Sequence, residues 1–535
     1  MVKVVLTADR ALFTDFNSCE ALGFGLCMPM RLVPRFIEYR ILAPPAPVGR
    51  KGRAAFAPYA LAKVEAALLA AGFRRDEIVI TPPEHVEKVI DKDTAVVGVH
   101  VVDPQGLAPV SWTLRVLTGG GVTCTQYEFE KLMEKLAKLR RKYRFKVIVG
   151  GPGVWQLKGL EEKFNIDVLF DGEAELTFPL IVRKVLSGED IPRYVRGDIV
   201  PADKVPLILT PSRNGVVQIT RGCPRRCQFC SPTMFFFRSI PINVVLREIE
   251  LNLKAGVKGV GYATEDVLLY GARGLDLNPE AVMKLFSKTL KVARRYGIDK
   301  VGFSHVTLSS ALVLKNVVKF ITDVNGFSDS EPTFPQVGLE SGSPRIVGMY
   351  FRGKAYPWSP EEWPDVVLKG AKLLNDNYWY PCLTYIIGFP DTTPEDYLKT
   401  TELIDKLRDE GFKGWVFPLL LVPIGGTQIE SKASFKVLKD LPQEALDCIT
   451  AGWILSIKFS RAIYPKVFSS IRNPLIHKIV SNVTEKAIEA MANWILAVRR
   501  NPEVVERKFS RINLRYLPSL VAAVVRSRNT LVLPP

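Results

Sequence analysis

Three cysteines stand close together in the segment Cys223-Pro224-Arg225-Arg226-Cys227-Gln228-Phe229-Cys230. Three thiolates at this spacing suit a soft metal centre. A structural zinc site would need a fourth ligand, usually from a second pair of cysteines or histidines, but the next histidine along the chain is His305 and the next cysteine is Cys382. The trio therefore favours an iron–sulfur cluster with one open position, and zinc remains the alternative.

The chemistry of these cysteines depends on the compartment. The chain has 535 residues, of which 47% are hydrophobic and 24% are charged, as in an ordinary folded protein. No apolar stretch approaches the ~20 residues needed to cross a bilayer, and residues 1–30 lack the pattern of a secretory signal. We therefore expect a cytoplasmic protein whose eight cysteines stay reduced.

The charge of the chain bears on its partners. The net charge is +17, and residues 435–535 alone contain 16 Lys or Arg against 7 Asp or Glu. Such a basic excess suits nucleic acid, an anionic lipid surface or an acidic substrate. Because the basic residues do not form runs interleaved with aromatic residues, nucleic acid is the disfavoured partner, whereas peripheral contact with an anionic membrane surface stays open.

The first part of the chain alternates strand and helix patterns. Within residues 1–198 the strand patterns are Val2–Thr7, Ile78–Thr81, Ala95–Val102, Lys146–Val149 and Asp167–Phe170. With helical patterns between them, this part predicts an α/β fold with a doubly wound, Rossmann-like parallel sheet. Ligands of such sheets bind beyond the carboxyl ends of the strands. The composition of residues 193–215 indicates a linker.

A second alternating series follows the linker and carries the cysteines. Its six strand patterns are Val216–Thr220, Val257–Ala263, Lys300–His305, Phe334–Glu340, Tyr380–Ile387 and Trp415–Val422. Six such steps predict a partial (βα)6 barrel over residues 205–431, with the cysteine trio in the loop after its first strand. Residues 432–535 predict an all-helical region, with prolines at positions 442, 465, 474, 502 and 518 as breaks.

The pattern Cys-x3-Cys-x-aromatic-Cys after a first barrel strand resembles the signature of radical S-adenosylmethionine (SAM) enzymes. In that family three thiolates hold a [4Fe–4S] cluster whose remaining iron binds SAM, and reduction yields methionine and a 5′-deoxyadenosyl radical. The resemblance implies that Cys223, Cys227 and Cys230 are the cluster ligands and that Phe229 packs near the adenine. Arg225 and Arg226 would then tune the cluster or its electron donor, unless they lie on a solvated loop.

Later strand ends resemble the cofactor-binding segments of the same family and follow in the same order. The residues 262–266 take the place of the acidic motif of the second strand, without its two usual glycines, and imply that Glu265 receives the methionine amine. Residues 338–343 resemble the segment that faces the ribose and methionine, residues 385–390 the segment that contacts adenine, and residues 423–427 the end of the sixth strand. The further contact residues implied are Glu340, Ser341, Ile387, Gly388 and Pro390.

The N-terminal part resembles the cobalamin-binding half of the B12-dependent branch of this family, so the likeness covers roughly residues 1–430. Two loops after strands carry it, and the residues implied to contact cobalamin are His100, Asp103, Gly106, Gly150, Gly151 and Gly153. Glycines let backbone approach a flat, bulky ligand closely. The motif Asp-x-His-x-x-Gly is absent, so we expect cobalamin without a histidine lower ligand, or a domain that has lost cobalamin.

These resemblances imply an enzyme that modifies an unactivated carbon, with C-methylation as the first hypothesis. A related alternative is carbon–carbon bond or ring formation on an isoprenoid lipid, cradled by basic, apolar helices over Trp453–Ile471 and Ala487–Val498. An alternative of another class is a non-catalytic protein that binds zinc and RNA. A tRNA methylthiotransferase is disfavoured, because the N-terminal part has no second cysteine trio.

Catalytic residues and partners complete these expectations. His305, at the end of the third barrel strand, is a candidate acid–base group, with a structural hydrogen bond as the alternative. Asp266 is a second candidate. The expected partners are a small-molecule or lipid substrate and an electron donor such as ferredoxin or flavodoxin.

Overall fold

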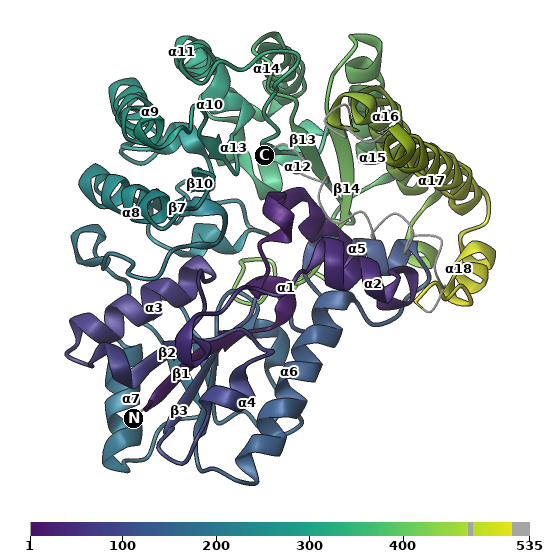
Figure 1. Ribbon diagram of the computed structural model, residues 1–535. Helices are drawn as coiled ribbons and strands as arrows, with labels where there is room; N and C mark the ends of the chain where they lie inside the picture. The colour runs from purple at the N-terminus through teal and green to yellow at the C-terminus, as the bar shows by residue number, and fades with distance from the viewer. Residues whose placement is uncertain (1, 469–473, 516–535) are drawn as a thin grey trace.

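The computed structural model describes residues 2–468 and 474–515. Two α/β units are joined along the chain, and long helices follow the second unit (Figure 1). In this view the sheet of the N-terminal unit lies below and the barrel of the second unit lies above. The fold class expected from the sequence, a doubly wound sheet followed by a partial barrel and helices, is confirmed.

The N-terminal unit is a six-stranded parallel sheet in the order β2-β1-β3-β4-β5-β6. The strands are β1 (Val4–Ala8), β2 (Ile78–Ile80), β3 (Val96–His100), β4 (Lys146–Gly150), β5 (Val168–Asp171) and β6 (Tyr194–Arg196). Both faces are apolar because helices cover both. The covering helices are α3 (Tyr59–Ala70) and α7 (Phe178–Ser187) on one face, and α4 (Val86–Val89) and α6 (Cys124–Arg140) on the other.

Strand β6 corrects the expected linker. The sequence prediction placed residues 193–215 between the two units, but Tyr194–Arg196 pair in parallel with β5 at the edge of the sheet. Only Val195 of this strand is buried, whereas Tyr194 and Arg196 are exposed. A single buried residue gives no alternation, so the pattern carried no strand signal.

The second unit contains six barrel strands in two parallel three-stranded sheets, β11-β10-β7 and β12-β13-β14. A bridge between His305 and Gln336 joins the two sheets. The strands are β7 (Val216–Gln218), β10 (Gly261–Ala263), β11 (Gly302–Phe303), β12 (Gln336–Glu340), β13 (Cys382–Ile387) and β14 (Trp415–Leu420). The outer helices are α8 (Ile242–Lys254), α9 (Pro279–Ala293), α10 (Leu308–Val313), α11 (Lys315–Asn325), α14 (Trp363–Asp376) and α15 (Pro394–Asp409).

Two small elements were not expected from the sequence, and both lie beside the cysteines. The first is an antiparallel hairpin of β8 (Thr220–Arg221) and β9 (Arg238–Ser239), whose connecting loop contains the cysteine trio. The second is the pair of short helices α12 (Pro344–Tyr350) and α13 (Arg352–Ala355), which follows β12. Segments this short have no hydrophobic periodicity by which a pattern could detect them.

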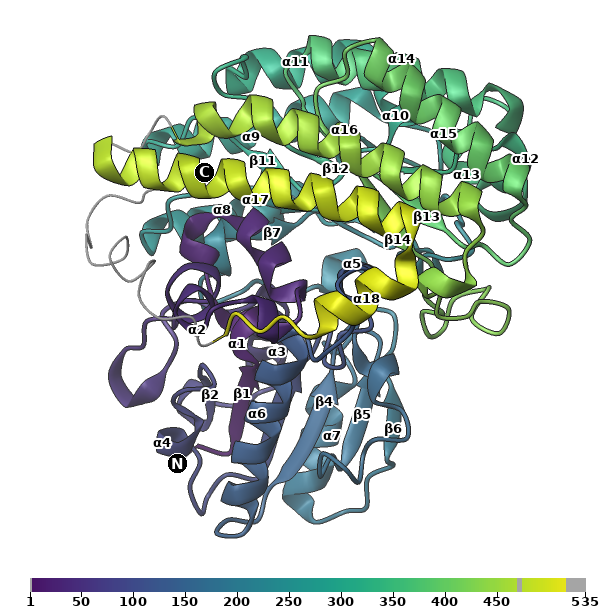
Figure 2. The same cartoon turned by 90° about the vertical axis from the view of Figure 1, so that its right-hand side faces the viewer.

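The helices α16 (Gln443–Phe468), α17 (Pro474–Arg500) and α18 (Pro502–Ser510) form the C-terminal region. α16 covers the edge strand β14, where the Ser456 hydroxyl accepts from the Val416 N–H and donates to the Val416 carbonyl, both at 2.8 Å. Figure 2 shows α17 lying along α16 on the outside of the barrel. Pro465 lies inside α16, so the break expected there is wrong, whereas Pro474 and Pro502 begin helices.

One of the two expected lipid-facing segments, Trp453–Ile471, packs on the barrel and lies partly outside the described residues. Trp453 and Phe459 of α16 pack against Phe417 and Trp415 of β14, so this apolar face of α16 is turned to the barrel. The end of the segment Trp453–Ile471 and the prolines beyond residue 515 lie outside the described residues. No described helix has the length and apolar character needed to cross a membrane.

Candidate functional site

The cysteine loop begins at a position that only glycine can occupy. Gly222 has φ +73°, and a Cβ there would lie 2.5 Å from the carbonyl oxygen of Phe235. Cys227 is buried, and Cys223 and Cys230 are partly buried. The Thr233 hydroxyl donates to the carbonyls of Cys227 at 3.0 Å and Cys230 at 2.7 Å. The backbone of the trio is therefore held from within the loop.

The short helices α12 and α13 clamp this loop from outside. The backbone N–H of Gln228 donates to the carbonyl of Tyr350 at 2.9 Å, and its side chain donates to the carbonyl of Met349 at 2.6 Å. Gly353 packs directly against Arg225, since a Cβ at Gly353 would lie 2.2 Å from the Arg225 carbonyl oxygen. The cysteine loop thus runs alongside residues 349–354.

Arg225 and Asp266 form a buried ion pair that also holds the loop. Arg225 is 5% exposed, and its Nη2 lies 3.2 Å from Asp266 Oδ2. Ser310 Oγ donates to the same oxygen at 2.7 Å, and the N–H of Leu268 donates to Asp266 Oδ1 at 3.1 Å. Both oxygens of Asp266 are therefore engaged. These contacts give Asp266 a positioning role, and the acid–base role expected from the sequence stays a prediction.

The hairpin that carries the loop is tied to the N-terminal sheet by further ion pairs. Arg221, directly before Gly222, contacts Glu173 at 3.0 Å and also pairs with Glu175. Arg238 contacts Glu173 at 2.5 Å from the other strand of the hairpin. Glu173 and Glu175 follow β5, so the end of the N-terminal sheet holds the base of the cysteine loop.

The three thiols have the chemistry that an iron–sulfur cluster requires. Burial raises the pKa of all three, that of Cys227 to about 12, and the charge of Cys227 further raises the pKa of Cys230. Thiols in this state are protonated until a metal displaces the proton. Within residues 2–468 and 474–515 no set of three His, Cys, Asp or Glu side chains closes around a single ion. An iron–sulfur cluster does not need such an arrangement, because each thiolate binds a different iron. The three cysteines are therefore a suitable donor set for the cluster.

Glu340 reaches the site through a strained turn at the end of β12. Its φ is +63°, and the register of β12 against β13 shifts between Gly338 and Glu340. Trp363 Nε1 donates to the carbonyls of Leu339 and Ser341, both at 3.1 Å, and so fixes the turn. A residue in the left-handed region costs energy, and such strain is found where a side chain must be aimed at a site.

Lys354 is a candidate site residue that no motif in the sequence indicates. Its ammonium group pairs with Glu340, and a Cβ at Gly338 would fall 1.9 Å from the Glu340 carboxylate and 2.0 Å from Lys354 Nζ. Burial dominates the pKa of Cys227 and of Glu265 and raises both, and the positive charge of Lys354 opposes it in each case. Lys354 therefore lies between the cysteines and the acidic side chains of the barrel. It belongs to a four-residue helix, and no spacing in the sequence marks it.

Glu265 and His305 face the interior of the barrel. Both residues are exposed, yet the surrounding protein raises the pKa of Glu265 and lowers the pKa of His305 to about 4. Lys354 lowers both values by its charge. Within the described part of the chain, the Glu265 carboxylate has no hydrogen bond or ion pair. His305 is neutral near pH 7, and Glu265 is a carboxyl group left for a ligand.

Phe229, which the resemblance places near the adenine, belongs to an aromatic cluster beside the cysteines. Phe229 contacts Phe389 and Phe351 edge to face, with ring centroids 5.6 and 6.1 Å apart, and Tyr350 stacks on Phe389 at 4.7 Å. Of the other expected contact residues, Ile387 and Gly388 are buried and Pro390 is exposed. The Ser341 hydroxyl lies 3.2 Å from Thr400 of α15 and is buried there. The structure thus brings Phe229, Glu340 and Glu265 to the cysteine site and turns Ser341 toward a helix.

The glycines expected to receive cobalamin pack against the chain itself. A Cβ at Gly151 would lie 2.4 Å from the Val101 carbonyl oxygen and 2.6 Å from His100 Nδ1, and one at Gly153 would lie 2.4 Å from the Val102 carbonyl oxygen. Gly106 meets Thr123 in the same way, at 2.5 Å, and Gly150 packs on Phe170. These glycines let the loops after β3 and β4 lie against each other, and their packing gives no cradle for a corrin ring.

The polar residues of the same region are also engaged. Asp103 Oδ1 accepts from the Ala108 N–H at 2.8 Å and from the Gln156 side chain at 3.0 Å, and Thr125 donates to Oδ2 at 3.3 Å. Burial lowers the pKa of His100 to about 4, so this histidine is neutral. Cobalamin binding by these residues stays a prediction that their packing does not support.

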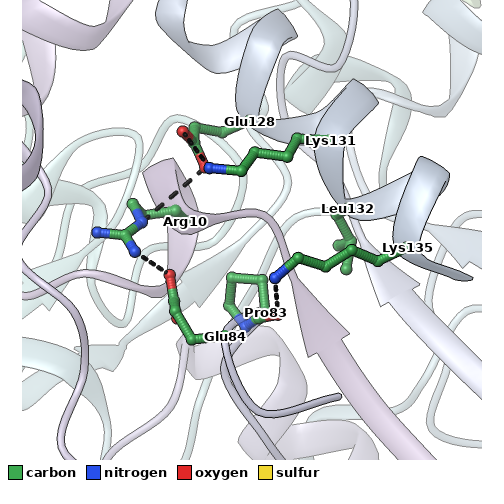
Figure 3. Close-up of a pocket in the computed structure, with 7 residues that line it drawn as sticks. All are labelled: Arg10, Pro83, Glu84, Glu128, Lys131, Leu132 and Lys135. Carbon is green, nitrogen blue, oxygen red and sulfur yellow. Dashed lines mark hydrogen bonds and ion pairs between the residues drawn. The ribbon is translucent and has the colours of Figure 1, made fainter. Parts of the chain in front are cut away.

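A small pocket opens at the carboxyl ends of β1 and β2 (Figure 3). Its volume of about 30 Å³ holds one water molecule. Arg10 lies 2.5 Å from Glu84 and 3.9 Å from Glu128, and Lys135 donates to the Pro83 carbonyl at 3.0 Å. The charged side chains that line it thus pair with one another, and the pocket offers no room for a large cofactor.

Comparison with known proteins defines the class of the second unit. Residues 217–404 match the model of the Radical SAM superfamily. This segment holds the cysteine loop and the first five barrel strands, so it is a Radical SAM domain.

Individual relatives refine this class. A Pyrococcus horikoshii protein described as an uncharacterized methyltransferase is 27% identical over 300 residues, which cover 49% of this chain and 58% of that protein. An uncharacterized protein of Methanocaldococcus jannaschii is 22% identical over 360 residues, which cover 56% of this chain and 68% of the relative. A tRNA-2-methylthio-N(6)-dimethylallyladenosine synthase of Magnetococcus marinus is 26% identical over 291 residues, covering 52% of this chain and 62% of that enzyme. The chain thus spans less than two thirds of the first and third of these proteins.

A solved structure resembles both units together. The radical S-adenosylmethionine methyltransferase TsrM from Kitasatospora setae, with tryptophan and a SAM analogue bound, superposes with a TM-score of 0.53 at 15% identity, over 80% of this chain and 75% of TsrM. A second TsrM structure, with cobalamin and a [4Fe–4S] cluster bound, gives a TM-score of 0.51. At this identity the likeness concerns the fold.

Proposed function

We propose that this chain is a Radical SAM enzyme in which Cys223, Cys227 and Cys230 hold a [4Fe–4S] cluster. The observation that carries the proposal is the position of the three buried or partly buried thiols, on one clamped loop directly after the first barrel strand, inside the segment that matches the superfamily model. Such a cluster, when bound, supplies the electron that cleaves SAM and so provides a radical able to attack an unactivated carbon.

The charged residues around the loop suit the two ends of the methionine part of SAM. Lys354 presents an ammonium group beside the cysteines, which suits a carboxylate. Glu265 presents a carboxyl group that has no partner within the described residues, which suits an amine. Each charged end of the ligand then meets an opposite charge, and such charge-assisted hydrogen bonds are stronger than neutral ones. Glu340 holds Lys354 in place through their ion pair.

We propose further that the reaction methylates a carbon of a small-molecule or lipid substrate. The proposal is supported by the relative described as a methyltransferase and by the TsrM-like arrangement of both units. No step is assigned to cobalamin, because the residues singled out for it pack against the chain itself. Product analysis distinguishes the outcomes: methylation adds the mass of one CH2 group, whereas ring closure removes two hydrogens.

The test is anaerobic reconstitution with iron and sulfide, followed by measurement of iron content, electron paramagnetic resonance and 5′-deoxyadenosine formation from SAM. We expect Cys227→Ala to lose the cluster signal and all 5′-deoxyadenosine formation, because one of three ligands is gone. Cys19→Ala, which changes a partly buried cysteine of the N-terminal unit, is the matched control and retains both. A colourless wild-type protein that binds zinc in place of iron would overturn the proposal.

A further inference from the structure

Two exposed arginines lie on the outer side of the cysteine loop. Arg226, between the first two cysteines, is exposed at φ +56°, and Arg352 is exposed at the start of α13. Neither guanidinium forms a hydrogen bond or ion pair within residues 2–468 and 474–515. They differ in this from their neighbour Arg225, whose guanidinium is buried and bonded to Asp266 and Ser310.

The two arginines belong to one surface. Gln228 bonds to Tyr350, and Gly353 packs on Arg225, so the backbone around Arg226 lies against the backbone around Arg352. Two more exposed side chains adjoin them on α12: Arg345, whose Nη1 lies 3.5 Å from the sulfur of Met349, and Met349 itself. We call this surface the arginine rim and define it by Arg226, Arg345, Met349 and Arg352.

Two of the acids near the rim are engaged. Asp396 pairs with Arg345 and accepts from Ser343 at 2.5 Å. The Asp391 carboxylate accepts from the Tyr350 hydroxyl, and its backbone carbonyl accepts from Arg345 at 2.5 Å. A third, Glu361, lies in the short helix η13 (Pro360–Glu362), which packs against Gly348 of α12; it is exposed and forms no hydrogen bond or ion pair within the described residues. Arg226 and Arg352 leave the rim itself positively charged, with the apolar Met349 beside them.

We propose that the arginine rim is the docking surface for an acidic one-electron carrier protein. The proposal rests on the proposed function, because cleavage of SAM consumes one electron that the carrier loses and the cluster gains. The rate of electron transfer falls steeply with the distance between donor and acceptor. The rim lies on the outer side of the loop that carries the three thiols. Exposed positive charge attracts and orients an acidic partner, and so raises the rate of association at low salt.

The experiment compares two reductants on the reconstituted protein. Reduced flavodoxin, an acidic carrier, and photoreduced 5-deazariboflavin, a small uncharged reductant, are each mixed with protein, and the visible absorbance of the cluster is followed. We expect Arg226→Glu and Arg352→Glu each to slow reduction by flavodoxin about tenfold at low salt and to flatten its salt dependence, since rim charges act on association. Reduction by deazariboflavin is unchanged. Lys284→Glu/Lys288→Glu, which reverses two exposed charges on the outer helix α9, is the matched control and changes neither rate.

The outcomes separate this proposal from the function on which it rests. If the protein holds no iron, the proposed function fails first. If the cluster is present and flavodoxin reduces wild type and both reversals at the same rate, the docking proposal is overturned. A charge reversal that slows reduction by both reductants alike disturbs the cluster itself. In that case Arg352→Gln, which removes a positive charge outside the cysteine segment, is tested with the same two reductants, and an unchanged flavodoxin rate overturns the docking proposal. Binding of the rim to anionic vesicles without any effect on the flavodoxin rate would also count against it.

Discussion

Two edges of parallel strands meet in this protein, and they differ in how their polar side chains are used. At the barrel interior, Glu265 has no partner within the described residues, and Lys354 has only Glu340. At the carboxyl edge of the N-terminal sheet, Asp103 accepts three hydrogen bonds, and Arg10 pairs with Glu84 and Glu128. Both edges are places where such folds bind ligands. Of the residues compared, only Glu265 has no partner within the described part of the chain.

Glycines differ between the two edges in the same way. Gly338 in the barrel leaves room for a functional ion pair, because a Cβ there would meet the side chains of Glu340 and Lys354. Gly151 and Gly153 at the other edge leave room for backbone, because a Cβ there would meet the carbonyls of Val101 and Val102. A glycine after a strand is therefore no sign of a ligand by itself, and what fills the space beside it decides its meaning.

The largest expected effect concerns Lys354. Lys354→Met keeps most of the side-chain volume but leaves Glu340 without its partner and removes the cation beside Cys227 and Glu265. We expect 5′-deoxyadenosine formation to fall about 100-fold, as when one well-placed charged donor is lost from an active site. SAM affinity, measured by calorimetry on the reconstituted protein, should fall with it.

Lys354→Arg is the conservative counterpart. It keeps the positive charge but replaces a compact ammonium group by a planar fork, so we expect partial recovery of SAM affinity. The cluster signal should be present in both variants, because neither removes a thiol. Normal SAM binding and cleavage by the Lys354→Met variant would show that Lys354 does not belong to the site. The difference described between the two edges would then be weaker.

The cysteine trio could be predicted from the sequence, but the short helices α12 and α13 that hold its loop could not. Cys223, Cys227 and Cys230 are spaced within eight residues, and a local pattern of this kind needs no tertiary information. Lys354 lies more than 120 residues further along and reaches Cys227 only because α12 and α13 pack on the loop. Neither short helix has a periodic pattern, so no local signal pointed to it.

Two neighbouring arginines show the same limit on what can be predicted from the sequence. Arg225 and Arg226 are indistinguishable in sequence, yet Arg225 is buried against Asp266 and Arg226 is exposed. Asp266 holds the loop, which its sequence position did not indicate, because Arg225 and Ser310 lie where they meet its carboxylate. Most of the strands were predictable because buried parallel strands form apolar runs. The pairing of single polar side chains was not, because it depends on contacts distant in sequence.

The next largest effect tests whether the N-terminal glycines serve packing. Gly153→Ala would place a Cβ 2.4 Å from the Val102 carbonyl oxygen and 2.7 Å from Pro104 Cδ. We expect a loss of about 2 kcal/mol in the free energy of unfolding, within the range for overpacking. Chemical denaturation measures it, with SAM cleavage by the folded protein unchanged.

Gly49→Ala is the matched control, since Gly49 has φ −89° and the nearest atom to its Cβ position lies 3.8 Å away. It should change stability by a few tenths of a kcal/mol at most. Titration with hydroxocobalamin sharpens the comparison. If Gly153→Ala left stability intact and abolished cobalamin binding, the glycine would serve a ligand after all, and the two edges would be alike.

The last expected effect is a pH dependence, which reports how well water is excluded from the N-terminal edge. Asp9 follows β1 and accepts from the Leu12 N–H at 3.1 Å. Burial, together with the charges of Glu128 and Asp103, raises its pKa to about 7, although hydrogen bonds from the backbone of Leu12 and Ala11 oppose the rise. An unfolded Asp ionises near pH 4, so between about pH 4 and pH 7 the folded state holds a proton that the unfolded state has lost. This stabilisation is complete below pH 4 and disappears as the pH rises through 7.

Asp9→Asn isolates this contribution, because His100 acts in the opposite sense over part of the same range. The lowered pKa of His100, about 4, makes the unfolded state bind the extra proton, so its contribution is lost as the pH falls. We expect the free energy of unfolding of the wild type, relative to Asp9→Asn, to decline by about 1–3 kcal/mol between pH 5 and pH 8. A constant difference would mean that Asp9 is hydrated and ionised at both pH values. The edge would then be open to solvent, and the contrast with the barrel interior would rest on the glycines alone.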